Sequence, residues 1–201
     1  MKNSIYGVIV NEQTKIFFTG AGISVDSGIP TFQEQPEIRD RLTRDFANEY
    51  PEEYRNTIRQ MLDSCENASP NEAHIEIAKG GFPVITMNVD QLHTKAGSKN
   101  VIEVHGVLPT REELEEELFP LTYDGIVLYG DLAPKYDDAI KMVRNLEYDN
   151  SYFIIVGTSF YTGVSEQLYR IAKQRHAKIE IINEDASKRV PIVCKNLAMK
   201  L

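Results

Sequence analysis

Residues 15–30 read KIFFTGAGISVDSGIP, a short apolar run followed by a break into glycines and other small residues. The run at 15–19 is typical of a buried strand, and the glycines allow a tight turn close to a ligand. A helix beginning near Ile23 would point its N–H groups and positive dipole end at that turn. The stretch therefore favours an anion site of the kind that holds a pyrophosphate. Because Ser24 or Val25 stands where the usual dinucleotide fingerprint has a third glycine, a turn used only for packing stays an alternative.

The composition is that of an ordinary globular chain, with 201 residues, 42% of them hydrophobic and 26% charged. This length suits one domain with a sizeable core, or one domain plus a small insertion. The formal net charge of -8 argues against nucleic acid as a partner. No apolar run approaches the roughly 20 residues that span a bilayer, and the N-terminus lacks a secretory signal, so no membrane partner is expected.

The two cysteines, Cys65 and Cys194, are isolated in the sequence. Neither belongs to a Cys-x-x-Cys pair, so the sequence supports neither a disulfide scaffold nor a cysteine zinc site. We therefore expect a reducing, cytoplasmic setting. The sequence does not indicate an oligomeric state.

Strand-like runs alternate with helical patterns along the whole chain. Strands are expected at 15–19, 82–86, 100–104, 152–156 and 178–182, with a strand and loop at 125–134 and a final short strand in 190–201. Helices are expected at 38–62, divided by Pro51, and at 69–79, 136–147 and 164–176. Ser69 should cap the helix at 69–79, and His74 should face the core as a structural residue. The alternation predicts an α/β fold with a doubly wound, Rossmann-like parallel sheet.

Polar residues follow several of the expected strands, where open α/β sheets bind ligands. Asn88 and Asp90 follow the second strand, although an Asx-rich turn that caps the next helix is the alternative there. His105 follows the third strand, and an imidazole can accept a proton near neutral pH. Small or polar residues follow the last two strands: Gly157, Thr158, Ser159, Asn183 and Glu184. A polar side chain after such a strand commonly bonds an adenosine ribose.

Seven motifs, in order along the chain, resemble those of the sirtuin family. They are GAGIS at 20–24 with SGIPTF at 27–32, PNEAH at 70–74, Asn88-x-Asp90, EVHG at 103–106, Tyr129-Gly130-Asp131, GTS at 157–159, and Asn183. Each motif is weak or moderate alone, and the set in this order is specific. The resemblance covers nearly the whole chain, which it implies is one domain at 1–201.

The resemblance implies an NAD-dependent protein-lysine deacylase that consumes NAD, releases nicotinamide and transfers the acyl group to ADP-ribose. His105 would be the general base, Asn88 would contact ribose and water, and Asp90 would hold the nicotinamide amide. The implied cofactor-binding residues are Gly20, Ala21, Gly22, Ser24, Ile29, Phe32, Gln33, Met87, Asn88, Asp90, Gly157, Thr158, Ser159, Asn183 and Glu184. Residues 36–68 would be the helical insertion with the cofactor loop. An acyl-lysine peptide would add as a strand at Tyr129, Gly130, Asp131 and Leu132.

The sequence departs from the family in three places. Sirtuins usually carry four zinc-binding cysteines after the His-Gly motif, but residues 107–124 hold neither cysteine nor histidine and read as an acidic helix capped by Thr110. We therefore expect a reduced remnant of that module and no zinc. Gln33 stands where the family has arginine, which removes an interaction of roughly 1.5–3 kcal/mol if made as a charged hydrogen bond. Met87 replaces a glutamine.

These departures leave two other functions open. One is ADP-ribosyl transfer or plain NAD hydrolysis, which altered cofactor contacts and a reduced insertion could permit. The other is a non-catalytic protein that binds NAD or ADP-ribose. The release of nicotinamide with and without an acyl-lysine peptide distinguishes all three.

Overall fold

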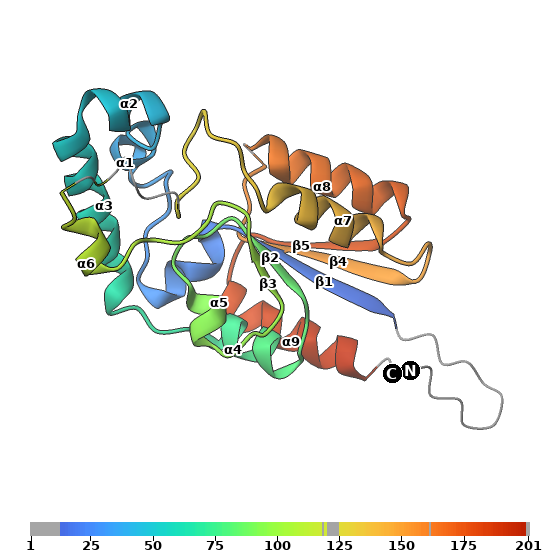
Figure 1. Ribbon diagram of the computed structural model, residues 1–201. Coiled ribbons are helices and arrows are strands. Elements are labelled where there is room, and N and C mark those ends of the chain that lie inside the picture. Colours follow the sequence, from blue (N-terminus) through green and yellow to red (C-terminus); the bar gives the residue numbers. More distant parts are fainter. Residues whose placement is uncertain (1–12, 118, 120–124, 161, 200–201) are drawn as a thin grey trace.

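A five-stranded parallel sheet forms the centre of the computed structural model, which describes residues 13–117, 119, 125–160 and 162–199 (Figure 1). The strands lie in the order β3-β2-β1-β4-β5. Their bounds are β1 Thr14–Thr19, β2 Val84–Thr86, β3 Val101–Glu103, β4 Ser151–Val156 and β5 Lys178–Ile182. Because β1 is central and the later strands add on both sides of it, the predicted doubly wound parallel sheet is confirmed.

The register aligns the carboxyl ends of all five strands at one edge of the sheet. Thr19 is paired with Thr86 of β2 and with Val156 of β4. Thr86 is paired in turn with Glu103 of β3, and Val156 with Ile182 of β5. The residues that follow these strands therefore meet along one line, where ligands bind in folds of this kind.

Helices cover both faces of the sheet. α4 (Glu72–Lys79) and α9 (Ala186–Ala198) lie on one face, and α7 (Tyr136–Arg144) and α8 (Gly163–Gln174) lie on the other (Figure 1). Phe17 of β1 packs in the core under α4 and α9, whereas its neighbour Phe18 packs in the core under α7 and α8. Burial on both faces explains the continuous apolar runs of these strands.

A separate group of helices lies to one side of the sheet: α1 (Pro36–Asp40), α2 (Arg44–Glu49), α3 (Pro51–Glu66) and α6 (Arg111–Leu114) (Figure 1). Their buried side chains, including Tyr54, Ile58 and Leu114, form a third core. The break predicted at Pro51 is confirmed, since α2 ends at Glu49 and α3 begins at the proline. The assignment of residues 36–68 to a cofactor-loop insertion stays an interpretation.

The expected acidic helix after the His-Gly motif is present but short. α6 spans Arg111–Leu114, and Thr110 caps it through a complete capping box with Glu113. Residues 118 and 120–124 of the expected zinc-module remnant lie outside the described part of the chain. Within that part, no helix has the length and apolar character needed to cross a membrane.

Two sequence-based expectations about strands are wrong. The tail forms α9, not a strand, because its buried residues Val190, Val193, Cys194 and Leu197 repeat at a helical period. The expected strand at 125–134 forms only isolated bridges, one from Ile126 to Gly106 and one from Tyr129 to Thr43.

Two expectations about helix starts also need correction. Asn71, and not Ser69, caps α4, because the Asn71 side chain accepts from the Ala73 N–H at 3.0 Å. The helix expected near Ile23 starts earlier, as the 3₁₀ helix η1 (Ala21–Ser27), and it ends at Gly28 with φ of 85°. This tighter winding keeps the small residues of the glycine stretch close to the sheet edge.

Candidate active site

Two glycine turns meet backbone to backbone at the carboxyl edge of the sheet. The Gly22 N–H donates to the Gly157 carbonyl at 3.0 Å, joining the turn after β1 to the turn after β4. A Cβ on Gly22 would lie 2.6 Å from the Gly157 Cα, and a Cβ on Gly20 would lie 2.7 Å from the Gly157 carbonyl oxygen. Only glycine allows this approach, so the packing role considered for the Gly-Ala-Gly stretch is present in the structure.

The same contact changes the expected role of the first N–H groups of η1. The Gly22 N–H is used by Gly157, and the Ile23 N–H donates to the Gly20 carbonyl at 3.1 Å. These two donors, expected to face an anion, are therefore bonded within the protein. What the turns do provide is a narrow, backbone-lined edge between β1 and β4, with half-buried Ala21 beside it.

A hydrogen-bonded group of polar side chains lies between the turns that follow β1 and β2. Ser24 Oγ donates to Asp90 Oδ2 at 2.7 Å, and Asn88 Nδ2 donates to Ser24 Oγ at 3.1 Å and to Asp90 Oδ2 at 3.2 Å. Ser24 and Asp90 are buried, whereas Asn88 is half-buried. The sequence-predicted residues from two distant motifs are therefore in direct contact.

Asp90 also has the structural role that was considered for it. Its Oδ1 accepts from the Leu92 N–H at 2.9 Å, at the start of α5 (Leu92–Lys95). This is the Asx-type turn of the alternative interpretation. Asp90 therefore fixes the turn and holds Asn88, and Asn88 is the more accessible of the two side chains.

His105 lies just beyond β3, and its ring orientation is defined. Its Nδ1 lies 3.2 Å from the Met87 carbonyl oxygen, so Nδ1 carries the proton and Nε2 is the basic nitrogen. Burial lowers the pKa of His105, and the bond to Met87 partly opposes this shift. The ring is thus neutral near pH 7 and can accept a proton there.

The backbone around His105 is fixed from both sides. The Val127 N–H donates to the His105 carbonyl at 2.9 Å. Gly106 follows with φ of 74°, and a Cβ at this position would lie 1.4 Å from the Gly125 carbonyl oxygen. A glycine is therefore required after His105 for the returning chain to pack against it.

Met87 joins the imidazole to the first glycine turn. Its N–H donates to the Thr19 carbonyl at 3.0 Å, and its carbonyl oxygen faces His105. A Cβ on Gly20 would lie 3.2 Å from the Met87 Cε. One residue therefore spans from the Gly20 turn to His105, so these two parts of the predicted site are adjacent.

The Met87 thioether itself points toward the turn after β4. The Thr162 hydroxyl donates to its sulfur at 3.3 Å. A thioether is a weak acceptor and cannot donate, so this position offers no hydrogen bond donor to a ribose. Thr162 was not singled out from the sequence, because nothing local marks its approach to residue 87.

The residues predicted for the adenosine half lie together after β4 and β5. Asn183 Oδ1 accepts from the Thr158 N–H at 3.0 Å, and the Gly157 N–H donates to the Ile182 carbonyl at 2.8 Å. Thr158 is buried, whereas Ser159, Asn183 and Glu184 are exposed. Exposed hydroxyl, amide and carboxylate groups beside a glycine turn can bond a ribose.

Three predicted cofactor residues lie apart from this group. Phe32 and Gln33 are exposed in the loop after η1, and Ile29 packs against the core of the helical group. Among the described residues, no hydrogen bond or ion pair joins Gln33 to the glycine turns or to His105. The exposed Gln33 amide makes none of these contacts within the protein, so whether it replaces the arginine of the family motif stays a prediction.

The predicted peptide segment is already paired with the helical group. The Tyr129 N–H donates to the Leu42 carbonyl, and the Arg44 N–H donates to the Tyr129 carbonyl, both at 3.0 Å. Arg44 also holds Asp131 through two bonds, Nε to Oδ1 at 2.8 Å and Nη2 to Oδ2 at 2.7 Å. A peptide that adds here as a strand must therefore use an edge other than the one Tyr129 presents to Leu42.

The Tyr129 and Leu132 side chains of that segment nevertheless face solvent. Tyr129 is 59% exposed and Leu132 is 93% exposed, and the intervening Gly130 turns the chain with φ of 99°. Large exposed apolar side chains in one short segment are typical of a binding surface. Arg44, which orients this segment, was not recognised in the sequence because its partner lies 87 positions away.

Two buried histidines lie beneath the site. His93 Nε2 is 3.0 Å from Thr19 Oγ1, and the ring of His74 packs edge-on to that of His93 with centroids 4.8 Å apart. Burial lowers the pKa of His74 to about 4 and that of His93 to about 3. Both rings are therefore neutral interior groups. His74 faces the core as expected, but neither of its ring nitrogens has a hydrogen-bond partner among the described residues, so it is not the satisfied structural residue that the sequence favoured.

The donor set does not fit the zinc site that the family resemblance implies. Cys65 and Cys194 are buried in two different cores, under the helical group and under α9. Among the described residues, no three histidine, cysteine, aspartate or glutamate side chains are grouped so that they could hold a metal ion.

The residues do fit a dinucleotide. Glycine turns after β1 and β4, the Ser24–Asn88–Asp90 group and the oriented imidazole of His105 follow neighbouring strands at one sheet edge. This arrangement defines the class, an α/β protein with a dinucleotide-type site at its topological switch point.

Comparison with known proteins identifies the family. A sequence model described as the Sir2 family matches residues 20–115. The NAD-dependent protein deacetylase of Thermotoga maritima is 31% identical over 91% of this chain and 87% of its own. The NAD-dependent protein deacylase 1 of Archaeoglobus fulgidus is 30% identical over 100% of this chain and 93% of its own. The chain belongs to the Sir2 family, the enzymes known as sirtuins.

Solved sirtuin structures share this architecture. A structure described as Sir2Tm bound to a propionylated peptide has a TM-score of 0.76 and 27% identity, covering 94% of this chain and 95% of that one. A complex described as Sir2-p53 peptide-NAD+ has a TM-score of 0.78 and 26% identity, with the same coverage of 94% and 95%. The fold class predicted from the sequence is confirmed as sirtuin-type.

Proposed function

We propose that this chain is an NAD-dependent protein-lysine deacylase, which moves the acyl group of a modified lysine to ADP-ribose and releases nicotinamide. The observation that carries the proposal is the placement of His105. Its imidazole is neutral, its Nε2 is basic, and Met87 joins it to the glycine turns that follow the central strand. The relatives named above, with NAD-dependent deacetylase or deacylase activity in their names, support the same reaction.

The residues of this chain have separate roles in the proposal. When bound, NAD supplies a ribose carbon that loses nicotinamide and accepts the acyl oxygen. His105 Nε2 accepts a proton from a ribose hydroxyl, while the Met87 carbonyl holds the Nδ1 proton and stabilises the ring after protonation. Asn88 orients ribose or water, and Asp90 keeps Asn88 in place. The glycine turns at 20–22 and 157–159 let the dinucleotide lie close to the backbone along the sheet edge.

The substrate side rests on the segment 129–132. Its exposed Tyr129 and Leu132 side chains provide apolar contact for an acyl-lysine peptide or protein. Its backbone is fixed by Arg44. Of the sirtuin structures named above, one is described as bound to a propionylated peptide and the other as a complex with a p53 peptide and NAD+.

Two observations favour a second candidate, peptide-independent NAD hydrolysis or ADP-ribosyl transfer. The Tyr129 backbone is already paired with Leu42 and Arg44, which limits how a peptide can pair there. Gln33 and Met87 stand where the family resemblance implies two other cofactor-contacting residues. A protein that binds NAD without turnover is the remaining outcome.

The test measures nicotinamide release from NAD by the full chain, with and without an acetyl-lysine peptide. The deacylase proposal predicts release that depends on the peptide and is lost in His105→Gln, with NAD affinity retained. Release at the same rate without peptide would support hydrolysis instead. Saturable NAD binding with no release at all would leave a binding protein.

We also propose that the chain works without zinc and in the cytoplasm, with neither nucleic acid nor membrane as a partner. The absence of cysteine and histidine from residues 107–124 supports the first point. Two unpaired cysteine thiols support a reducing location. The net charge of -8 supports a partner other than nucleic acid. Zinc content measured in the purified protein tests the metal proposal directly.

A further inference from the structure

We propose that the buried guanidinium of Arg55 anchors the bridging segment, residues 107–117 with Phe119, to α3 and so holds the active-site chain on either side of it. This segment stands where the family's zinc module is expected. Arg55 is a positioning residue in this proposal, since it acts through the segment and touches neither reacting group.

The bridging segment begins two residues after His105, and the described chain resumes beside His105 at Gly125. The Val107 N–H donates to the Gly125 carbonyl at 3.0 Å, and Gly106 forms an antiparallel bridge with Ile126. The chain then runs back past His105, whose carbonyl accepts from the Val127 N–H. The segment is thus closed at its base by backbone bonds beside His105, and its far end needs a separate attachment.

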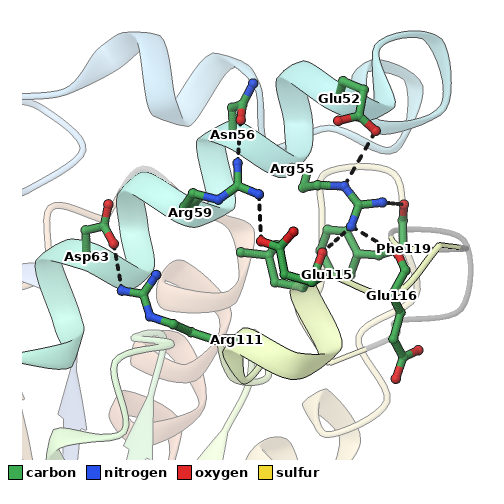
Figure 2. Close-up of polar contacts among 10 residues, drawn as sticks. Glu52, Arg55, Asn56, Arg59, Asp63, Arg111, Glu115, Glu116 and Phe119 are labelled. Atoms are coloured by element: carbon green, nitrogen blue, oxygen red, sulfur yellow. Dashed lines mark hydrogen bonds and ion pairs between the residues drawn. The ribbon is translucent and has the colours of Figure 1, made fainter.

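Arg55 provides that attachment. Its Nη1 donates to two carbonyl oxygens, that of Leu114 and that of Glu116, the latter at 3.0 Å (Figure 2). Its Nη2 donates to the carbonyl oxygen of Phe119 at 2.9 Å. The guanidinium carbon also lies 5.3 Å from the centroid of the Phe119 ring. Because a guanidinium is a rigid fork of donors, one side chain gathers three carbonyls at and just after the C-terminal end of α6.

Burial makes this contact different from the ion pairs around it. The Arg55 side chain is only 10% exposed. Arg59 pairs with Glu115 at 2.7 Å, but these side chains are 34% and 62% exposed, so solvent screens them (Figure 2). The pairs of Arg111 with Asp63 and Glu66 are also exposed. Removing Arg55 takes a charged donor away from the buried carbonyls of Leu114 and Phe119, whereas removing Arg59 affects only surface groups.

The same surroundings explain why an arginine can replace a metal here. A structural metal holds a loop by drawing several ligand atoms to one positive charge. Arg55 draws three carbonyl oxygens to one positive charge. Glu115, Asp63 and Glu66, the carboxylates along the α3–α6 contact, are each already paired with an arginine.

The anchor connects to the peptide side of the active site. Leu108, Leu114 and Phe119 of the segment pack in the same core as Tyr54 of α3 and Leu128. Leu128 directly precedes the substrate segment, and its N–H donates to Asp131 Oδ2 at 3.1 Å. Release of the segment should therefore loosen the peptide side first, while the glycine turns on the far strands keep their own bonds.

The test compares Arg55→Ala with Arg59→Ala in the full chain, four residues apart on one helix and facing the same segment. A glutamate-specific protease can cut after Glu112, Glu113, Glu115, Glu116 and Glu117. We expect Arg55→Ala to be cut there at least about tenfold faster than Arg59→Ala, the factor that 1.4 kcal/mol of lost anchoring gives. Methylguanidinium should slow the cleavage of Arg55→Ala and leave Arg59→Ala unchanged.

Two more measurements complete the test. The KM for an acetyl-lysine peptide should rise about tenfold in Arg55→Ala with the NAD KM nearly unchanged, and methylguanidinium should restore it. If Arg55→Ala does not fold, Arg55→Lys keeps the charge but loses the fork, and its cleavage should be intermediate. The protease result stands even if the enzymatic proposal fails, because it does not depend on turnover.

Three results would overturn the inference. One is equal cleavage of the two alanine variants, and another is cleavage of Arg55→Ala that methylguanidinium does not slow. The third is stoichiometric zinc in the wild-type protein, whose removal by a chelator exposes the bridging segment. We expect the wild-type protein to keep its resistance to the protease when a chelator is added.

Discussion

The contact between the two glycine turns makes Gly157→Ala the most informative single substitution. A Cβ at Gly157 would lie 2.3 Å from the Ile23 nitrogen and 2.5 Å from the Gly22 carbonyl carbon, against an ordinary contact of 3.4–4 Å. Both atoms are backbone and cannot rotate away. The turns must separate by about 1 Å, which lengthens the Gly22–Gly157 hydrogen bond beyond bonding range.

The loss of stability expected in Gly157→Ala has two separate causes. Overpacking of this kind destabilises by about 1–3 kcal/mol. Gly157 also has φ of 63°, and a side chain in that left-handed region adds about 1–2 kcal/mol. Gly28→Ala is the matched control, because Gly28 has φ of 85° and nothing within 4 Å of its added Cβ. The control therefore carries the backbone strain without the clash.

Urea unfolding and calorimetric titration with NAD measure the two consequences. Gly157→Ala should lose more stability than Gly28→Ala by the overpacking term, and its affinity for NAD should fall at least about tenfold, the factor that 1.4 kcal/mol gives. Gly28→Ala should bind NAD nearly as the wild type does. If both variants unfold at the same urea concentration and bind NAD equally well, the contact between the turns does not shape the site.

Three other predictions concern the peptide segment, the buried histidines and the altered cofactor contact. Arg44→Met should raise the peptide KM several-fold and leave the NAD KM unchanged, because the charged bonds that orient Asp131 are lost. Partial exposure of this ion pair keeps the effect below about 3 kcal/mol. Steady-state kinetics with each substrate varied in turn test this, and a shift in the NAD KM would contradict it. Burial lowers the pKa of His74 to about 4 and that of His93 to about 3, so below about pH 6.5 the unfolded chain takes up protons that the folded chain does not. The free energy of unfolding in urea should therefore fall by roughly 2 kcal/mol between pH 7 and 5 because of His74 alone. This pH-dependent loss should be smaller in His74→Leu. Met87→Gln should lower the dissociation constant for NAD about two- to tenfold, which is the gain expected from one neutral hydrogen bond. An unchanged dissociation constant would show that residue 87 does not reach the ribose.

The parts of the fold that follow from local sequence were predictable. The apolar run at 15–19 and the glycines after it specify a strand and turn within one short stretch, and the structure has both. Pro51 divides two helices for a purely local reason, its missing N–H. His105 could be placed at the sheet edge because a short β-branched run precedes it and parallel strands end together.

The errors arose where tertiary packing outweighs local preference. The tail has several β-branched residues, which favour a strand, but one side of a helix buries Val190, Val193 and Leu197 against the sheet. The Tyr129 segment pairs singly with Thr43 and not with the main sheet. No local pattern reports the position of the partner in either case.

The long-range ion and hydrogen bonds of the site could not be predicted for the same reason. Arg44 meets Asp131 across 87 positions, and Arg55 meets Phe119 across 64. In the sequence, each arginine is one charge in a strongly charged helical stretch. Only the packing of α2 and α3 shows which arginines are buried or oriented by a partner.

The central claim is that a neutral His105, held against the Met87 carbonyl beside the glycine turns, drives acyl transfer to ADP-ribose. Mass spectrometry of the products formed from NAD and an acetyl-lysine peptide tests it most directly. The wild-type chain should yield O-acetyl-ADP-ribose in step with deacetylated peptide, and His105→Ala should yield neither while still binding NAD. Deacetylated peptide from His105→Ala, or a wild-type reaction that forms ADP-ribose without acetylated product, would contradict this assignment.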